Sequence, residues 1–258
     1  MRTFVKELTN PGVTLTAYLP AASDEMPNYK TRPAILVIPG GAYMMCSDRE
    51  AEPIALSFLA KGYAAFVLRY SVGKGAAKFP RPLNDAEEAM ELIISNAAEW
   101  GVEPEHIAAI GFSAGGHLCA ALGTMGRVRP AACVLGYPCI LSSIGRILAE
   151  PVPSLDEKVD ANTPPTFIVA AREDGCVPIE NSLTYAAALD KAGVPFEMHI
   201  YERGYHGFSV ADGTVYSKPE DAEYNARIKG WLDICIAWLN THFNRYLSNP
   251  RCCEAARF

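Results

Sequence analysis

The sequence predicts an α/β protein with a mostly parallel central sheet and helices on both faces. Short, continuous apolar runs such as Ala34–Ile38 and Thr166–Ala171 are typical of strands that are buried on both faces. Helical patterns lie between these runs, and strands that alternate with helices form parallel sheets. The length of 258 residues is sufficient for one large α/β domain with a sizeable core.

The elements are expected in the following order. The apolar and β-branched runs predict strands over Phe4–Leu8, Val13–Leu19, Ala34–Ile38, Tyr63–Leu68, Ile107–Ile110, Ala132–Tyr137, Thr166–Ala171 and Phe196–Tyr201. The helical patterns predict helices from Ser47 to Lys61, from Asn84 towards Gly101, from His117 onwards, over Glu180–Ala192 and over Glu223–Tyr246. The first two strands form a hairpin around Asn10-Pro11-Gly12. Ser47 and Glu50 have the spacing of a capping box, and Gly62 is expected to end that helix.

Composition excludes several classes of function. The net charge of −6 and the isoelectric point near 5.4 argue against nucleic acid or an anionic membrane as a partner. No apolar run approaches the roughly 18 residues that span a bilayer, and Met1–Glu7 lacks the apolar core of a secretory signal. The eight cysteines lack C-x-x-C spacing, so we expect reduced thiols in a cytoplasmic protein.

The chain is expected to form one domain over residues 1–248, followed by a flexible tail over residues 249–258. No repeat, low-complexity tract or linker divides it. Cys252 and Cys253 fall in the tail. The sequence leaves the oligomeric state open.

Gly111-Phe112-Ser113-Ala114-Gly115 is the motif with the most chemical content. It follows the predicted strand Ile107–Ile110 and precedes a helical run that begins at His117. A G-x-S-x-G between a strand and a helix forms a sharp turn that exposes the serine hydroxyl above the sheet. We therefore predict Ser113 as a nucleophile.

A serine nucleophile needs a base and a group that orients the base. Asp174 follows the strand Thr166–Ala171 beside Gly175, and His206 lies in a glycine-flanked loop after the last strand. Both positions fall at the carboxyl ends of strands, where α/β sheets bind ligands. The other four histidines are expected to be structural: His106, His117, His199 and His242. For His117 we expect a buried ring bonded to the backbone.

An acyl-transfer site also needs donors for the oxyanion. The backbone N–H of Ala114 supplies one, and the glycine-rich loop Pro39-Gly40-Gly41-Ala42-Tyr43 supplies another. The spacing leaves open which residue of that loop donates. No metal-ligand spacing and no G-x-G-x-x-G motif occurs, so we expect neither a metal nor another cofactor.

Taken together, these motifs resemble those of the α/β-hydrolase esterases related to hormone-sensitive lipase, in the acetylxylan-esterase-like branch. The motifs are Ile38–Tyr43, Ser47–Glu50, Phe66–Ser71, Gly111–Gly116, Asp174–Pro178 and His206–Phe208. The resemblance implies an α/β-hydrolase fold with Ser113, Asp174 and His206 as the triad, and with Gly40, Gly41 and Ala114 as oxyanion donors. One departure is Pro39, where the wider lipase group has histidine. Relatives insert a cap where this chain has only a short segment, about 139–163.

The resemblance implies a serine carboxylesterase for short acyl groups, with acetylated carbohydrates such as xylo-oligosaccharides as expected substrates. A minimal lid leaves little apolar surface for a long acyl chain, and Tyr43 and Tyr205 are expected at the open rim, where a sugar ring could stack. Three alternatives remain: a general short-chain carboxylesterase, a small peptidase of the prolyl-oligopeptidase type, and an inactive ligand-binding homologue.

Overall fold

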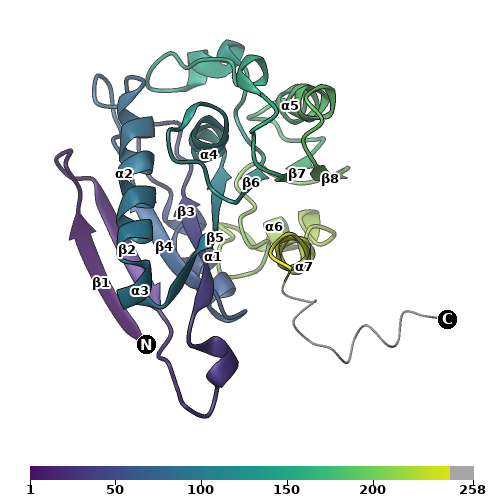
Figure 1. Ribbon diagram of the computed structural model, residues 1–258. Helices are drawn as coiled ribbons and strands as arrows, with labels where there is room; N and C mark the ends of the chain where they lie inside the picture. The colour runs from purple at the N-terminus through teal and green to yellow at the C-terminus, as the bar shows by residue number, and fades with distance from the viewer. Residues whose placement is uncertain (245–258) are drawn as a thin grey trace.

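Eight strands form the central sheet of the computed structural model, which describes residues 1–244 (Figure 1). The strands are β1 (Arg2–Glu7), β2 (Thr14–Leu19), β3 (Arg32–Ile38), β4 (Ala64–Arg69), β5 (Val102–Phe112), β6 (Ala132–Gly136), β7 (Thr166–Ala171) and β8 (Phe196–Tyr201). Their order across the sheet is β1-β2-β4-β3-β5-β6-β7-β8. The pairs β1–β2 and β2–β4 are antiparallel, and all other neighbours are parallel.

The strands differ in burial in the way that their sequences predict. All seven residues of β3 are buried, as are all six of β7, because helices cover both faces of the middle of the sheet. Strand β2 instead alternates buried and half-buried residues, with Leu15, Ala17 and Leu19 in the core. The predicted mostly parallel α/β class is therefore confirmed.

Two layers of helices enclose the sheet (Figure 1). The helices are α1 (Glu52–Leu59), α2 (Arg81–Ser95), α3 (Ala97–Trp100), α4 (Ala114–Met125), α5 (Glu180–Lys191), α6 (Pro219–Tyr224) and α7 (Trp231–His242). On one face, α2, α4 and α5 contribute residues such as Leu83, Leu118 and Leu189 to one apolar cluster. On the other face, α1 and α7 contribute Phe58 and Trp231 to a second cluster.

The end of the chain differs from its prediction. The sequence predicts one long helix over Glu223–Tyr246, but the structure has α6, a turn, and then α7. Gly230 lies between them with φ +93°, a left-handed conformation that interrupts the helix. Tyr246 and the predicted tail, including Cys252 and Cys253, lie outside the described residues.

The segment 139–163 carries two short 3₁₀ helices, Ser142–Ile147 and Asp156–Lys158. Its apolar side chains Ile140, Ile144, Leu148 and Leu155 are buried in the same cluster as α4. The segment therefore packs onto the body of the fold. Across residues 1–244, no helix combines the length and the apolar character that a membrane crossing requires.

Candidate active site

Ser113 lies in a sharp turn between β5 and α4. Its φ of +53° and ψ of −119° are unusual for a residue with a side chain. The turn is tight enough that a Cβ on Gly111 would overlap the carbonyl oxygen of Gly115. A Cβ on Gly115 would likewise overlap the carbonyl oxygen of Ile38, so both glycines of the motif are required by close backbone approach.

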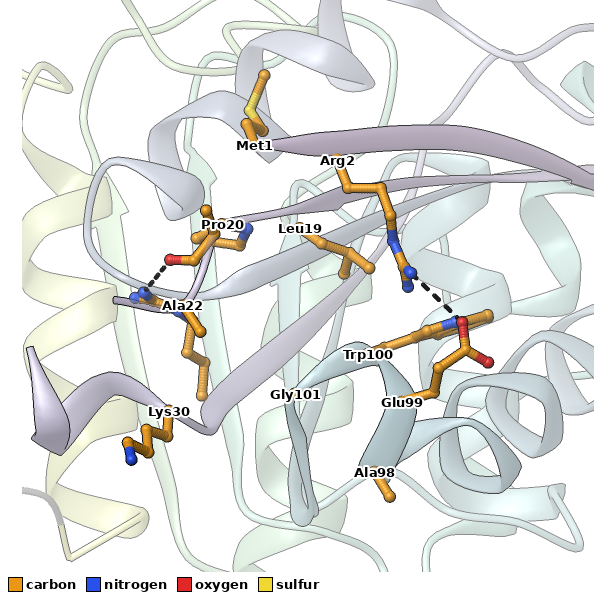
Figure 2. Close-up of a pocket in the computed structure, with 12 residues that line it drawn as sticks. Met1, Arg2, Leu19, Pro20, Ala22, Lys30, Ala98, Glu99, Trp100 and Gly101 are labelled. Carbon is orange, nitrogen blue, oxygen red and sulfur yellow. Dashed lines mark hydrogen bonds and ion pairs between the residues drawn. The ribbon is translucent and has the colours of Figure 1, made fainter. Parts of the chain in front are cut away.

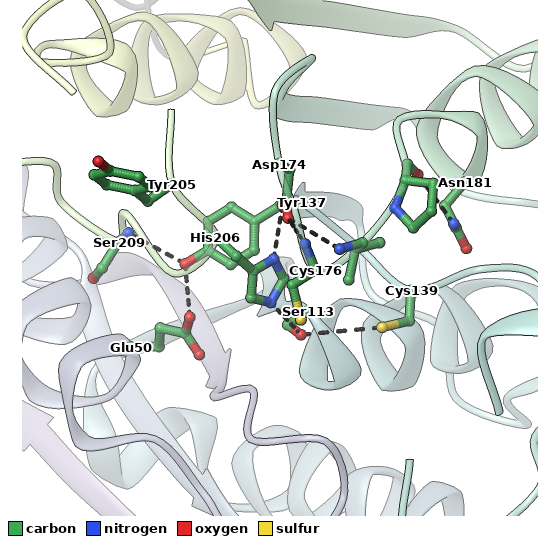
Figure 3. Close-up of polar contacts among 12 residues, drawn as sticks. Glu50, Ser113, Tyr137, Cys139, Asp174, Cys176, Asn181, Tyr205, His206 and Ser209 are labelled. Atoms are coloured by element: carbon green, nitrogen blue, oxygen red, sulfur yellow. Dashed lines mark hydrogen bonds and ion pairs between the residues drawn. The ribbon is translucent and has the colours of Figure 1, made fainter. Parts of the chain in front are cut away.

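The structure brings Ser113, His206 and Asp174 together in one hydrogen-bonded chain (Figure 3). The distance from Ser113 Oγ to His206 Nε2 is 2.8 Å, and that from His206 Nδ1 to Asp174 Oδ2 is 2.7 Å. An ionised carboxylate can only accept, so the ring proton belongs on Nδ1 and Nε2 is free to accept the hydroxyl proton. That is the tautomer that a general base requires.

Asp174 is held by its own loop. Its side chain is only 2% exposed, and Oδ1 accepts the backbone N–H groups of Cys176 and Val177 at 2.8 and 2.9 Å. The loop thereby fixes one carboxylate oxygen and leaves the other directed at His206. The neighbouring Glu173 points elsewhere, because its Oε2 accepts the Tyr224 hydroxyl at 2.6 Å.

The glycine-rich loop contributes differently from the prediction. The N–H of Gly40 donates to Glu50 Oε2 at 2.8 Å, so Gly40 is not available as an oxyanion donor. Within the described part of the chain, the N–H groups of Gly41, Ala42 and Ala114 have no acceptor in the protein. The predicted set of Gly40, Gly41 and Ala114 is therefore corrected at Gly40. Ala42 takes a left-handed φ of +57°, as Tyr43 does at +58°.

Glu50 is the residue that sequence reasoning missed. The structure shows no Ser47 side-chain cap, and the helix predicted from Ser47 begins as α1 at Glu52. The Glu50 carboxylate is buried beside the triad, where Tyr137 Oη donates to its Oε1 at 2.7 Å. Burial is the largest effect and raises the pKa of Glu50 above its ordinary value, although these hydrogen bonds oppose the rise. Gly62 does follow the end of helix α1 as predicted: it has φ +89°, and the N–H of Tyr63 donates to the carbonyl oxygen of Phe58.

Tyr43 does not lie at the rim where the sequence analysis expected it. The side chain is fully buried, and its hydroxyl lies 3.0 Å from His117 Nδ1. His117 Nε2 in turn lies 3.0 Å from the carbonyl oxygen of Pro153 in segment 139–163. The predicted buried, backbone-bonded His117 is thus what the structure shows, and burial lowers its pKa to about 4. Tyr43 and His117 together fasten the glycine-rich loop to that segment.

Tyr205 does lie at the surface beside the triad. It is 46% exposed and stacks on Tyr224, with ring centroids 4.1 Å apart and an interplanar angle of 15°. Met44 and Met45, which follow the glycine-rich loop in the sequence, are also exposed.

The other histidines and the cavity in Figure 2 lie apart from this chemistry. His106 bonds to Glu103, and His199 bonds to Glu197. His242 packs on the ring of Trp238. The cavity in Figure 2 has a volume of about 470 Å³ and is lined by residues that include Arg2, Lys30, Glu99, Trp100 and Gly101. Gly101 precedes β5 and Ser113 follows it. The cavity therefore lies at the end of β5 opposite to Ser113.

Comparisons with known proteins agree with this fold. Residues 16–133 match the BD-FAE family, and residues 149–236 match the prolyl oligopeptidase family. The crystal structure of MGS-M1, an alpha/beta hydrolase enzyme from a Medee basin deep-sea metagenome library, is 45% identical. It superposes with a TM-score of 0.88 and covers 95% of this chain and 98% of its own. The chain belongs to the α/β-hydrolase esterase family, in its acetylxylan-esterase-like branch.

Two further relatives are named for an activity. An acetyl ester-xyloside bifunctional hydrolase from Caldicellulosiruptor lactoaceticus is 36% identical, with a TM-score of 0.72 over 88% of this chain and 89% of its own. An acetylxylan esterase of Xylanibacter ruminicola is 30% identical over 74% of this chain and 44% of that protein. The chain spans about half the length or less of the curated relatives that it matches. The family resemblance predicted from the motifs is confirmed.

Proposed function

We propose that the protein is a serine carboxylesterase in which Ser113 is the nucleophile, His206 the base and Asp174 the acid. The observation that carries this proposal is the chain of hydrogen bonds from Ser113 Oγ through His206 to Asp174, at 2.8 and 2.7 Å, with Ser113 in the sharp turn between β5 and α4. Homology to esterases supports it.

The reaction follows from these contacts. His206 Nε2 takes the hydroxyl proton as Ser113 Oγ bonds to the ester carbonyl carbon. The same nitrogen then gives that proton to the departing alcohol oxygen, which leaves an acyl group on Ser113. Water repeats the two steps, releases the carboxylic acid and restores the serine.

The oxyanion of each tetrahedral intermediate needs donors that are not already used. The free N–H groups of Ala114, Gly41 and Ala42 fit that role, and Gly40 does not. Ala114 is the first residue of α4, so the positive end of the helix dipole also faces this charge.

We propose short acyl esters, acetyl above all, on a carbohydrate alcohol as the substrate. The names of the two relatives, an acetylxylan esterase and an acetyl ester-xyloside hydrolase, support this class. The apolar side chains of segment 139–163 pack against the core, so they do not line a long acyl tunnel. Each buried methylene would contribute about 0.8 kcal/mol, so activity would rise with chain length if such a tunnel existed. The exposed ring of Tyr205 offers a surface for a sugar.

Cytoplasmic placement is also a proposal. It is supported by buried free thiols at Cys119, Cys133, Cys139 and Cys235, which suit a reducing compartment.

A peptidase is the second candidate, because the prolyl oligopeptidase family matches residues 149–236, which contain Asp174 and His206. One substrate panel separates the candidates: acetylated xylo-oligosaccharides, p-nitrophenyl esters from acetate to octanoate, and peptide p-nitroanilides. We expect acetate release from the oligosaccharide and the highest ester rates at acetate and propionate. A maximum at octanoate would contradict the deacetylase assignment, and faster cleavage of anilides than of esters would favour the peptidase. Ser113→Ala is the control for each substrate, and its loss of activity would also exclude the inactive homologue.

A further inference from the structure

Glu50 lies beside the triad, yet the reaction described above gives it no role. Its side chain is buried, with 3% of the residue exposed, and both carboxylate oxygens are bonded. Oε2 accepts the N–H of Gly40 at 2.8 Å, and Oε1 accepts the hydroxyl of Tyr137 at 2.7 Å. Burying a carboxylate is costly unless such partners compensate it, so its place in this site calls for a function.

The Gly40 contact controls the glycine-rich loop. Gly40 directly precedes Gly41 and Ala42, whose free N–H groups are the proposed oxyanion donors. A Cβ on Gly40 would lie 2.7 Å from Glu50 Oε2, so loop and carboxylate are packed as closely as a glycine permits. Fixing the Gly40 peptide therefore fixes the direction of the donors that follow it.

The Tyr137 contact controls the base. The Tyr137 ring meets the His206 ring edge-on, with centroids 4.9 Å apart and an interplanar angle of 67°. Its hydroxyl also accepts the N–H of Ser209 at 3.2 Å, in the loop that carries His206 (Figure 3). The Ser209 hydroxyl donates to the carbonyl oxygen of Arg49, next to Glu50, at 2.5 Å. Ser209, three residues after His206, is thus tied to Glu50 through Tyr137 and to Arg49 directly.

We infer that Glu50 is a positioning residue of the proposed esterase: it aligns the oxyanion donors with His206 and favours the protonated imidazole that forms when Ser113 attacks. This inference rests on the proposed function. A carboxylate next to the imidazole attracts the positive charge that appears on the ring in the transition state, and in a buried site such an attraction is weakly screened.

The charges around Glu50 support an electrostatic contribution. The titratable groups that face it are Arg49, Tyr70, Tyr137, Cys139 and His206. Burial raises the pKa values of Tyr70, Tyr137 and Cys139, which keeps these groups neutral at physiological pH. The cations among these partners are therefore Arg49 and the imidazolium form of His206, and both lower the pKa of Glu50.

Glu50→Gln is the test, because glutamine keeps the size and can still accept from Gly40 while it removes the charge. For p-nitrophenyl acetate we expect kcat to fall about tenfold to hundredfold with KM changed less than about threefold, because the imidazolium that forms in the transition state loses the negative charge beside it. The acidic limb of the kcat/KM profile should also move to lower pH, because a neutral side chain no longer favours the protonated base. If Glu50 only held the loops in position, the acidic limb of the kcat/KM profile would stay at the wild-type pH.

Asp85→Asn is the matched control. Asp85 is also a fully buried carboxylate that accepts a backbone N–H, from Ser71 at 2.7 Å, and it has no contact with the triad. This variant is expected to keep the wild-type acidic limb whatever its melting temperature.

The inference is overturned if folded Glu50→Gln keeps kcat and the acidic limb of the wild type. If that variant does not fold, Tyr137→Phe decides, since it removes only the hydroxyl that links Glu50 to the His206 loop. We expect kcat to fall there as well, and an unchanged kcat would overturn the inference. A wild-type protein without esterase activity would instead contradict the proposed function.

Discussion

Replacing Asp174 with asparagine would change one atom of the proposed triad and, through it, the position of a proton. Asp174 Oδ1 accepts the backbone N–H groups of Cys176 and Val177, and Oδ2 bonds to His206 Nδ1 at 2.7 Å. Asparagine has one oxygen and one NH₂ group in the same space. The two backbone donors need the oxygen, so the NH₂ group must face His206.

The consequence follows from the two ring nitrogens of His206. Nδ1 would have to accept a hydrogen bond, which moves the ring proton to Nε2. A protonated Nε2 cannot take the proton of Ser113, which lies 2.8 Å away. In a serine protease where the same replacement imposes the wrong tautomer, kcat falls about 10⁴-fold. We expect a similar loss here, which corresponds to about 5 kcal/mol of transition-state stabilisation.

The assay is kcat for p-nitrophenyl acetate, with the melting temperature as a check on folding. Glu173→Gln is the matched control, since this adjacent carboxylate bonds to Tyr224 and not to the base. We expect it to stay within about threefold of wild type, as for most substitutions away from the chemistry. If folded Asp174→Asn kept more than about a tenth of the wild-type kcat, another group would be orienting His206 and the assignment would fail.

Three further predictions concern the surrounding residues. Because burial lowers the pKa of His117 from 6.5 to about 4, the unfolded chain takes up a proton that the native state rejects. The free energy of unfolding should fall by about 2 kcal/mol between pH 7 and pH 5, and urea titrations should show that this dependence is weaker in His117→Gln. Tyr43→Phe should lower the free energy of unfolding by about 1–3 kcal/mol, because His117 loses its partner, and should affect all ester substrates equally. Tyr205→Ala should reduce acetate release from acetylated xylo-oligosaccharides more than hydrolysis of p-nitrophenyl acetate; equal losses would exclude a sugar contact.

The features predicted well from the sequence are those determined by local patterns. Strands Thr166–Ala171 and Phe196–Tyr201 have the predicted bounds, because an apolar or alternating run bounded by turn residues specifies both ends. The expectation that Asp174 and His206 meet Ser113 depended on a topological rule, that parallel strands end at one edge, and the structure does bring them together there.

The features predicted wrongly depend on partners that are distant in the sequence. Glu50 has the spacing of a local cap, but Tyr137, 87 residues away, and Gly40 take its two oxygens. That same contact withdraws Gly40 from the predicted oxyanion donors. Tyr43 follows a glycine-rich loop, as a rim residue would, yet its left-handed backbone turns the ring into the core against His117. No pattern within a few residues of these positions contains that information.

Labelling with a fluorophosphonate probe tests the central proposal most directly, because the probe reacts only with a serine that its surroundings have activated. The mass of the intact protein should rise by one probe, and peptide mapping should place the adduct on Ser113. Esterase activity should disappear in proportion, and Ser113→Ala should take up no probe while keeping the wild-type melting temperature. An adduct on another serine, or an unlabelled protein that still hydrolyses p-nitrophenyl acetate, would contradict the account.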